Sequence, residues 1–331
     1  MKAAYFEAPG KPDVIRHGDL PTPSPGKGEV LVKVGAASLN PIDTYIRSGL
    51  VNMTLPRPFI PGCDLAGTVT AVGSGVSRFK PGDRVWGSNQ GLLGRQGTFA
   101  EFANVNEDWL YPTPAGVSDA EAAAVALVGI TAHLGLFRCA QLQNGETVFV
   151  NGGTGGVGSM VAQMARAAGA RAIATVGSQV KADLCRSWGI DLVLNYKTDD
   201  VPARIRDFTN GLGVQVWYET QREPDFQKTV ELLSRRGRMI IMAGRQAQPI
   251  FPVGPFYVKD CSLFGFAMFN ATPDEQRVCA DDINRWLAAK KLQVPIGKTF
   301  AFSEAAAAHQ FLEDNTLNKA GTLTGKIVLV P

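Results

Sequence analysis

The residues most suited to ligand chemistry are the glycine-rich string 152–158, Gly-Gly-Thr-Gly-Gly-Val-Gly. The string follows the apolar run 148–150, which is typical of a strand, and precedes a stretch with helical spacing. In such a turn, glycines let the backbone approach a pyrophosphate, and free N–H groups at the helix start attract the anion. The string therefore predicts a dinucleotide site, although a plain strand-to-helix turn is the alternative. The predicted contacts are Gly152, Gly155, Gly156, Val157 and Gly158.

The end of the next predicted strand distinguishes between the two nicotinamide dinucleotides. An NAD site usually carries Asp or Glu about 20 residues beyond the glycines, where the acid binds the ribose 2′-hydroxyl. At that place this chain has Val-Gly-Ser-Gln-Val-Lys at 176–181, without an acid. The Ser178 hydroxyl and Lys181 suit a 2′-phosphate, and Tyr196, after the third strand, could flank the same phosphate. We therefore expect NADPH; alternatively, Lys181 is a solvated surface charge.

Side chains that bind metals are few and scattered. A catalytic zinc needs converging Cys, His or carboxylate ligands, and a structural zinc usually needs four Cys or His ligands. His17, His133 and His309 lie far apart, and the five cysteines include no Cys-x-x-Cys pair. Cys63-Asp64 could belong to an unrecognised ligand set, or Cys63 could be a buried thiol behind a turn. We expect no metal.

The sequence shows two kinds of pattern, and the elements that they predict would position these residues. The first 120 or so residues contain short apolar runs, such as 29–34 and 67–72, separated by glycine- and proline-containing turns typical of β structure. From Ser118, where Ser-Asp-Ala-Glu resembles a capping box, strands and helices alternate. The alternation predicts a parallel sheet covered by helices on both faces. The expected strands are 146–151, 170–176, 191–195, 214–218 and 238–242, and a helix at 274–290 and a strand at 325–330 close the chain.

Bulk properties restrict the class of protein. A chain of 331 residues suggests two domains, and 45% hydrophobic with 19% charged residues is typical of a globular protein. A net charge of only +3, spread along the chain, argues against nucleic acid or a membrane surface as partner. The apolar stretch 122–137 is short for a membrane span and contains polar residues. Because the N-terminus lacks a signal-peptide core, we expect a cytoplasmic protein with reduced thiols.

These features together resemble one family. The chain is similar, over essentially its whole length, to the zinc-free quinone oxidoreductases of the zeta-crystallin type, in the medium-chain dehydrogenase/reductase superfamily. The most specific stretch is 39–49, Leu-Asn-Pro-Ile-Asp-Thr-Tyr-Ile-Arg-Ser-Gly, followed by 61–67, 79–85 and the glycine string. Zinc-dependent relatives carry a cysteine near Asn40 and a His–Glu pair where Cys63-Asp64 stands, so the resemblance agrees with the absence of metal ligands.

The resemblance implies an α/β protein of two domains. A GroES-like, β-rich catalytic domain would comprise residues 1–122 and 268–331, and a Rossmann NADPH-binding domain with a doubly wound parallel sheet would comprise 123–267. It also implies a cleft between the domains and usually a homodimer joined through Rossmann edge strands. Asn40, Asp43 and Tyr45 would line the nicotinamide end as catalytic residues. The implied cofactor contacts are Thr131 near the carboxamide, Gly177, Lys181 and Tyr196 at the 2′-phosphate, Phe264 and Phe266 where the chain passes over the cofactor, and Gly244.

Two departures from the family pattern concern the acceptor pocket. The fourth Rossmann strand continues Tyr-Glu-Thr-Gln-Arg at 218–222 instead of ending in an Asp-x-x-Gly-like turn. The segment 315–324 is longer than expected, so Lys319 is only a candidate for the basic residue that relatives place there. The pocket beyond the nicotinamide therefore need not accept the family's usual substrates.

The expected activity is hydride transfer from NADPH to a quinone without metal. The cofactor carries the hydride, and the Tyr45 hydroxyl or the Asn40 amide could stabilise negative charge on an acceptor oxygen. Tyr45 could instead pack one face of a short helix, Asn40 could brace a turn, and Asp43 could cap the following helix. The alternatives are an alkenal or enone double-bond reductase on the same scaffold, and a non-catalytic nucleotide-dependent RNA-binding or structural protein.

Overall fold

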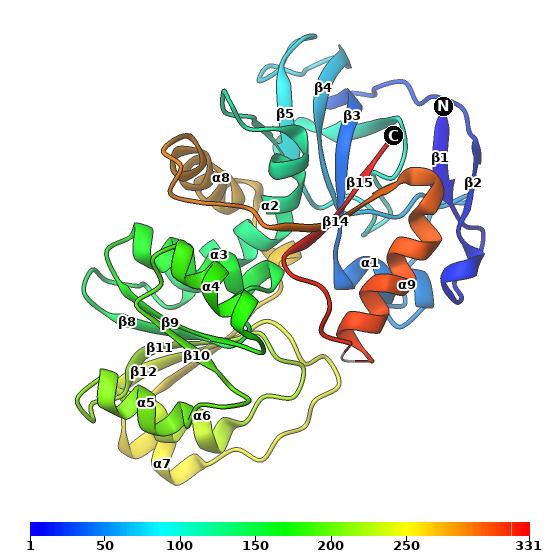
Figure 1. Ribbon diagram of the computed structural model, residues 1–331. Helices are drawn as coiled ribbons and strands as arrows, with labels where there is room; N and C mark the ends of the chain where they lie inside the picture. Colours follow the sequence, from blue (N-terminus) through cyan, green and yellow to red (C-terminus); the bar gives the residue numbers. More distant parts are fainter. Residues whose placement is uncertain (319) are drawn as a thin grey trace. The chain divides into compact units, whose positions relative to one another are not determined.

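The computed structural model describes residues 1–318 and 320–331, and the candidate residue Lys319 lies outside the described residues. The chain folds into two compact units, one of Met1–Leu127 with Val294–Pro331 and one of Val128–Gln293 (Figure 1). The second unit is therefore inserted into the first.

The boundaries of the units differ from the predicted ones. The second unit extends from 128 to 293, whereas the sequence suggested 123–267. Residues 268–293 belong to the second unit because α8 (Pro273–Ala288) is tied to it by ion pairs. Asp282 of α8 contacts His133 Nε2 at 2.9 Å, and Glu275 contacts Arg138 at 3.1 Å.

The first unit is built on a largely antiparallel sheet around the long strand β3 (Glu29–Leu39). Burial alternates along the first half of β3 and is continuous from Ala36, so the strand ends inside the core at Leu39. The main sheet has the order β14 (Ile296–Ala301), β15 (Lys326–Val330), β3, β4 (Asp64–Val72), β5 (Arg84–Gly87) and β7 (Leu110–Pro112), while β6 (Phe102–Asn106) pairs with β3 and β1 (Lys2–Tyr5) pairs with β2 (Arg16–Asp19).

The described part of this unit also contains α1 (Pro41–Ser48), α9 (Ala305–Thr316) and the first part of α2 (Asp119–His133). Helix α1 follows β3 directly and ends at Gly49, whose φ is 79°. Helix α9 belongs to the returning C-terminal segment. Helix α2 begins at the predicted capping box: Ser118 N donates to Glu121 Oε2 at 3.0 Å, and Glu121 N donates to Ser118 Oγ at 3.2 Å. The boundary between the two units falls inside α2.

The second unit contains the predicted parallel sheet. Its strand order is β10 (Leu192–Asn195), β9 (Arg171–Val176), β8 (Thr147–Val150), β11 (Val214–Glu219), β12 (Leu233–Ile241) and β13 (Ser262–Gly265). Helices α3 (Gly156–Ala167) and α4 (Gln179–Ser187) cover one face, and α5 (Val201–Phe208) and α6 (Phe226–Leu232) cover the other (Figure 1). This arrangement is the doubly wound Rossmann order, so the predicted α/β fold class is confirmed.

The remaining helical segments of the described chain are short. They are α7 (Val253–Val258), the π-helical turn Leu134–Cys139 that continues α2, and the 3₁₀ turns Pro12–Val14, Glu107–Trp109, Met268–Asn270 and Phe302–Glu304. The strand β13 and the helix α9 were not recognised in the sequence.

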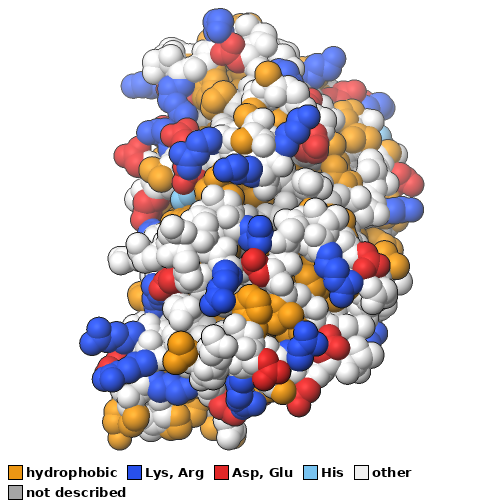
Figure 2. Space-filling view, turned by 60° about the vertical axis from the view of Figure 1, so that its left-hand side comes forward, with side chains coloured by type: hydrophobic (Ala, Val, Ile, Leu, Met, Phe, Trp, Pro, Cys, Tyr) orange, Lys and Arg blue, Asp and Glu red, His pale blue; other side chains and the backbone are white. Residues whose placement is uncertain are grey.

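The most apolar helical segment, Asp119–Cys139, is long and apolar enough to cross a membrane by length and composition. However, 78% of its 18-residue apolar window is buried inside the protein, as in the core helix of a soluble protein. The surface also agrees with the low net charge. On the face shown in Figure 2, Lys and Arg are interspersed with Asp and Glu.

Candidate active site

The glycine-rich loop joins β8 to α3, as the sequence predicted. Gly152 has a φ of 68°, which a residue with a side chain rarely adopts. A Cβ on Gly153 would lie 2.6 Å from Ala174 Cβ, and a Cβ on Gly158 would overlap the carbonyl oxygen of Gly152. Glycine is therefore required at these positions because the loop packs closely on β9 and on the start of α3.

Helix α3 begins at Gly156, so the N–H groups of Gly156, Val157 and Gly158 belong to its first turn. Such N–H groups have no partner inside their own helix and favour an anion. Gly155 is the N-cap residue and offers no side chain to occupy this position. The loop therefore has the geometry of a phosphate-binding turn.

A buried carboxyl braces this loop from the neighbouring strand. Glu219, at the end of β11, is 2% exposed, and its oxygens accept hydrogen bonds from Asn151 Nδ2 at 3.1 Å and Trp217 Nε1 at 3.1 Å. The Gln221 N–H donates to the same carboxyl at 2.8 Å. Burial raises the pKa of Glu219. The unusual sequence 218–222 thus connects the loop after β11 to the glycine loop.

The residues predicted for the 2′-phosphate lie together at the carboxyl ends of β9 and β10. A Cβ on Gly177 would overlap the Tyr196 hydroxyl, so the Tyr196 ring covers Gly177. Ser178 is the N-cap of α4, and its Oγ accepts a 3.4 Å hydrogen bond from Lys181 N. Burial, and then the charge of Lys197, lowers the pKa of Lys181. Two lysines therefore lie close to one another here, which favours an anion.

The other predicted cofactor residues lie on the same unit. Gly244, with a φ of 82°, follows β12 and packs against the backbone of Arg222 after β11. Thr131 of α2 is 5% exposed, and its carbonyl oxygen accepts a 2.7 Å hydrogen bond from the Tyr218 hydroxyl. Phe264 lies on the edge strand β13 and is 36% exposed, and Phe266 follows that strand. Their roles toward a cofactor stay predictions.

The predicted catalytic residues of the first unit belong to a buried polar cluster. Asn40 is fully buried, and its Nδ2 donates to Asp64 Oδ2 at 2.7 Å and to the carbonyl oxygen of Ser38 at 3.4 Å. The Asn40 Oδ1 accepts a hydrogen bond from Lys326 Nζ. Because both ends of its amide bind neighbours within the domain, Asn40 braces the chain before Pro41, which was the alternative reading of this residue.

Asp43 also has an internal role. It is 2% exposed, and its Oδ2 accepts a 2.7 Å hydrogen bond from the backbone N–H of Asn40, the N-cap of α1. This contact is the capping role that the sequence left open. Burial raises the pKa of Asp43 to about 7 and that of Asp64 to about 6. The Cys63 thiol lies beside Asp43, and burial raises its pKa as well.

This cluster does not fit a metal ion. Within residues 1–318 and 320–331, no group of three or more His, Cys, Asp or Glu side chains could hold a metal. Cys63 and Asp64, the candidate pair in the sequence, share their surroundings with the Lys326 ammonium, which already supplies a positive charge. A metal cation would be repelled by that charge.

Sequence reasoning missed Lys326 and Ser88, and it considered Asp64 only as a possible metal ligand together with Cys63. The Ser88 hydroxyl donates to Asp64 Oδ1 at 2.7 Å, and Lys326 is 5% exposed. The only signal for Lys326 was a lysine at the start of an otherwise apolar strand, which is also typical of a strand end that faces water.

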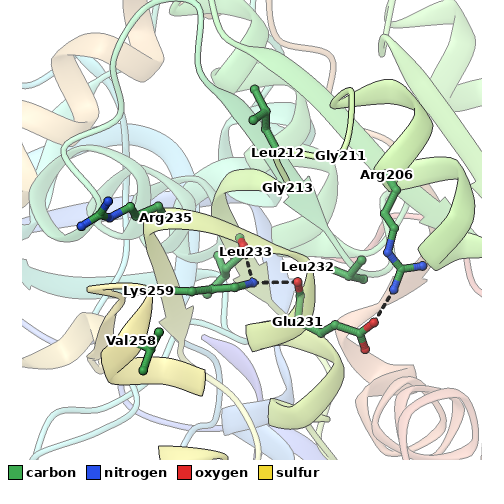
Figure 3. Close-up of a pocket in the computed structure, with 10 residues that line it drawn as sticks. All are labelled: Arg206, Gly211, Leu212, Gly213, Glu231, Leu232, Leu233, Arg235, Val258 and Lys259. Atoms are coloured by element: carbon green, nitrogen blue, oxygen red, sulfur yellow. Dashed lines mark hydrogen bonds and ion pairs between the residues drawn. The ribbon is translucent and has the colours of Figure 1, made fainter. Parts of the chain in front are cut away.

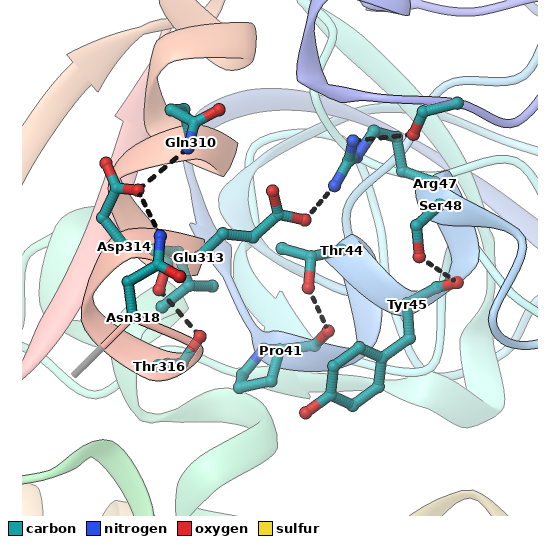
Figure 4. Close-up of polar contacts among 12 residues, drawn as sticks. Pro41, Thr44, Tyr45, Arg47, Ser48, Gln310, Glu313, Asp314, Thr316 and Asn318 are labelled. Carbon is teal, nitrogen blue, oxygen red and sulfur yellow. Dashed lines mark hydrogen bonds and ion pairs between the residues drawn. The ribbon is translucent and has the colours of Figure 1, made fainter.

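Tyr45 lies on α1 and is partly buried. Figure 4 shows its ring and the Arg47 guanidinium extending to opposite sides of that helix. Arg47 forms an ion pair with Glu313 of α9, and its Nη1 donates to the carbonyl oxygen of Gly10 at 2.7 Å. Helix α1 is thus held in place on the side opposite the Tyr45 ring.

A separate hollow of about 380 Å³ lies near the amino ends of β11 and β12 (Figure 3). The Lys259 ammonium on its wall donates to the carbonyl oxygens of Val230, Glu231 and Leu233 at 2.8 to 2.9 Å. Because the glycine loop lies at the carboxyl ends of the same parallel sheet, this hollow is not part of the dinucleotide site.

The fold and the loop define an oxidoreductase with one GroES-like and one Rossmann domain. Residues 26–115 match the family described as alcohol dehydrogenase GroES-like domain, and residues 156–283 match the family described as zinc-binding dehydrogenase. A quinone oxidoreductase of Rattus norvegicus is 32% identical over 331 residues, which cover 100% of this chain and 98% of the relative. The chain belongs to the zinc-free quinone oxidoreductase family of the medium-chain dehydrogenase/reductase superfamily.

Solved structures agree with this family. The Escherichia coli quinone oxidoreductase complexed with NADPH has a TM-score of 0.86 and 28% identity, with 100% of both chains covered. A structure described as an NAD-dependent alcohol dehydrogenase has a TM-score of 0.89 and 30% identity, also with 100% of both chains covered. Because these two relatives carry different cofactor names, the cofactor of this chain has to be argued from its own residues.

Proposed function

We propose that this protein is an NADPH-dependent quinone oxidoreductase that transfers hydride to the quinone without a metal. The observation that carries the proposal is the end of β9, where Ser178 and Lys181 stand in place of the acid of an NAD site. Lys181 and Lys197 supply positive charge for a 2′-phosphate, and the Tyr196 ring covers Gly177 beside them. The NADPH complex of the E. coli relative supports the same choice.

In this proposal the second unit binds the cofactor, and the first unit contacts the acceptor. NADPH supplies the hydride when it is bound. In the second unit, the N–H groups at the start of α3 bind the pyrophosphate, and the lysine pair binds the 2′-phosphate. In the first unit, the Tyr45 hydroxyl donates a hydrogen bond to the acceptor oxygen as negative charge develops there. Asn40 and Asp43 do not contact the acceptor in this proposal but hold the start of α1 in place. Both are buried and hydrogen-bonded to each other and to their neighbours.

Reduction of a quinone does not require a proton donor from the protein. The reduced product is a hydroquinone anion that water can protonate, so no dedicated general acid is required. An enone needs a proton on carbon as well as stabilisation of the oxygen. The quinone oxidoreductase relatives support a quinone as the first choice of acceptor.

The first experiment is a fluorescence titration of the purified protein with NADPH and with NADH, followed by turnover on 9,10-phenanthrenequinone and on a 2-alkenal. We expect tight NADPH binding, weak NADH binding and quinone-dependent NADPH oxidation. Oxidation with the alkenal alone would replace the quinone by an alkenal or enone acceptor. Absence of NADPH binding would refute the proposal.

We also propose a cytoplasmic homodimer. The five cysteines are free thiols in the structure, which suits a reducing compartment. Strand β13 is an edge of the parallel sheet, with Leu263 at 40% and Phe264 at 36% exposure. An edge strand with exposed apolar side chains is suited to pairing with a second copy. Light scattering at several protein concentrations would test the dimer, and a Leu263→Lys variant would be expected to dissociate it.

A further inference from the structure

Lys326 is an unusually placed lysine. It opens β15 and is 5% exposed, although lysines are rarely buried without a partner. Its ammonium donates to the carbonyl oxygen of Leu39 at 2.8 Å and to the side-chain oxygen of Asn40. These two residues are the last of β3 and the N-cap of α1. The ammonium therefore lies where the chain turns from the sheet into helix α1.

The charge of Lys326 is balanced by carboxyl groups from two other elements. Asn40 connects the ammonium to Asp64 at the start of β4, because its Oδ1 faces Lys326 while its Nδ2 donates to Asp64 Oδ2 at 2.7 Å. Asp43 of α1 accepts from the Asn40 N–H at 2.7 Å. Lys326, Asn40, Asp64 and Asp43 thus form one connected buried network.

Further polar side chains surround this network. Ser88 donates to Asp64 at 2.7 Å, and the Cys63 thiol lies beside Asp43. Arg95 interacts electrostatically with Cys63. The Lys326 charge lowers the pKa of both Asp43 and Asp64, against the larger effect of their burial. Removal of this charge would therefore leave both carboxyls protonated up to higher pH.

Helix α1 is fixed at both ends by charged groups of the returning C-terminal segment. Lys326 of β15 holds the beginning of the helix, and Glu313 of α9 holds Arg47 in its last turn. Tyr45 lies between these two anchors on a helix of only eight residues. A shift of either anchor would therefore move the Tyr45 hydroxyl, and a displacement of about 1 Å can lower turnover about 100-fold.

We propose that Lys326 is a positioning residue for the acceptor site: its buried ammonium fixes Leu39 and Asn40, and thereby the start of the helix that carries Tyr45. The inference rests on the proposed role of Tyr45 in quinone reduction. It assigns a function to a lysine that is buried inside the first unit and binds Leu39 and Asn40.

The test compares Lys326→Met, which keeps the volume and removes the charge, with Lys33→Met, which removes an exposed lysine from β3 of the same sheet. We expect Lys326→Met to lower kcat about 10- to 100-fold, to change the NADPH dissociation constant less than twofold, and to move the low-pH limb of the kcat profile to higher pH. Lys33→Met should behave as the unchanged protein. Unchanged kcat and an unchanged pH profile in folded Lys326→Met would overturn the proposal.

A double variant, Asp64→Asn with Lys326→Met, distinguishes the positioning of Asn40 by Lys326 from the balancing of the Asp64 charge. The same variant can be measured if Lys326→Met alone fails to fold. It removes both opposite charges, so it should fold while lacking the ammonium that holds Asn40. Low kcat in the folded double variant, with higher kcat in Asp64→Asn alone, supports positioning by Lys326, and full recovery of kcat in the double variant contradicts it.

Hydrogen exchange gives a readout that does not require turnover. Amides 42–48 of α1 should exchange at least tenfold faster in the Lys326 variants than in Lys33→Met, and equal exchange would contradict the anchoring. If the unchanged protein oxidised NADPH with neither quinone nor alkenal, the proposed function would fail, while the exchange data would still decide whether Lys326 anchors α1.

Discussion

The Arg47 guanidinium of α1 forms an ion pair with the Glu313 carboxylate of α9, and Arg47 is only 1% exposed (Figure 4). The partners are separated by 266 residues along the chain. A buried guanidinium without its carboxylate would keep a charge that water cannot solvate. The pair therefore connects the helix carrying Tyr45 to the segment that returns after the Rossmann unit.

Glu313→Gln should destabilise the first unit because it leaves the Arg47 charge uncompensated. Loss of one partner of a buried ion pair costs about 3 kcal/mol. The free energy of unfolding would be measured by urea titration. Asp314→Asn on the same helix removes a carboxylate whose partners among the described residues are the exposed Gln310 and Asn318, so its midpoint should stay nearly unchanged. Equal midpoints for both variants would show that the Arg47 pair contributes little.

Gly158→Ala should abolish cofactor binding. The added Cβ would overlap the carbonyl oxygen of Gly152, so the glycine loop would have to move away from the start of α3. Overpacking of this kind also costs about 1 to 3 kcal/mol of stability. Binding would be followed by the fluorescence of NADPH. Gly254→Ala is a matched control, because a Cβ at that position in α7 has no atom within 4 Å.

Lys181→Ala should weaken NADPH binding selectively. A hydrogen bond to a charged group contributes about 1.5 to 3 kcal/mol, which corresponds to an increase of about 10- to 100-fold in the dissociation constant. NADH has no 2′-phosphate, so its dissociation constant should change less than about twofold. Lys291→Ala removes an exposed lysine of the same unit and should affect neither cofactor. A parallel loss of both cofactors would assign Lys181 to the fold instead of to the phosphate.

His309 should make the first unit sensitive to acid. Its ring is fully buried, neither nitrogen has a hydrogen-bond partner among residues 1–318 and 320–331, and burial lowers its pKa to about 3. Below the ordinary histidine pKa near 6.5, the unfolded chain takes up a proton that the folded chain does not bind. Stability from this group is therefore complete above pH 6.5 and is lost as the pH falls toward 3.

His309→Leu removes this titration. The difference in unfolding free energy between His309→Leu and the unchanged protein should shift in favour of the variant as the pH falls from 6.5 to 5, with a slope that approaches about 1.4 kcal/mol per pH unit. Asp43 and Asp64 contribute in the opposite direction, since their raised pKa values favour the folded state at lower pH, but they are present in both proteins and cancel. A difference that does not depend on pH would contradict the buried neutral His309.

Local patterns allowed the glycine loop and its surroundings to be predicted. The sequence around Gly152 carries its own strand, turn and helix signals, and the capping box at Ser118 depends only on Glu121 three residues later. The identity of the residues at the end of β9 is likewise a local property. These features do not depend on distant parts of the chain, so a single sequence is sufficient for them.

Features that depend on distant contacts were not predictable. The amphipathic pattern of helix α8 does not show which unit the helix packs on. The sequence prediction assigned it to the first domain, whereas in the structure Asp282 of α8 binds His133 of the second unit. Strand β13 has four residues and no alternation. Lys326 meets Leu39 across 287 residues, because β15 pairs with the end of β3. Without that pairing, a lysine at the start of a strand predicts only solvent exposure.

Tyr45→Phe tests the proposed chemistry most directly. The variant keeps the ring, so the packing of α1 should be preserved and NADPH affinity should be unchanged. If the hydroxyl stabilises the developing oxyanion, kcat with 9,10-phenanthrenequinone should fall at least about tenfold, since one such donor commonly contributes more than that. Tyr257→Phe, at a position 67% exposed in α7, is the control for loss of a tyrosine hydroxyl. Unchanged kcat in Tyr45→Phe would leave Tyr45 with a packing role only, and the acceptor oxygen would then need another donor.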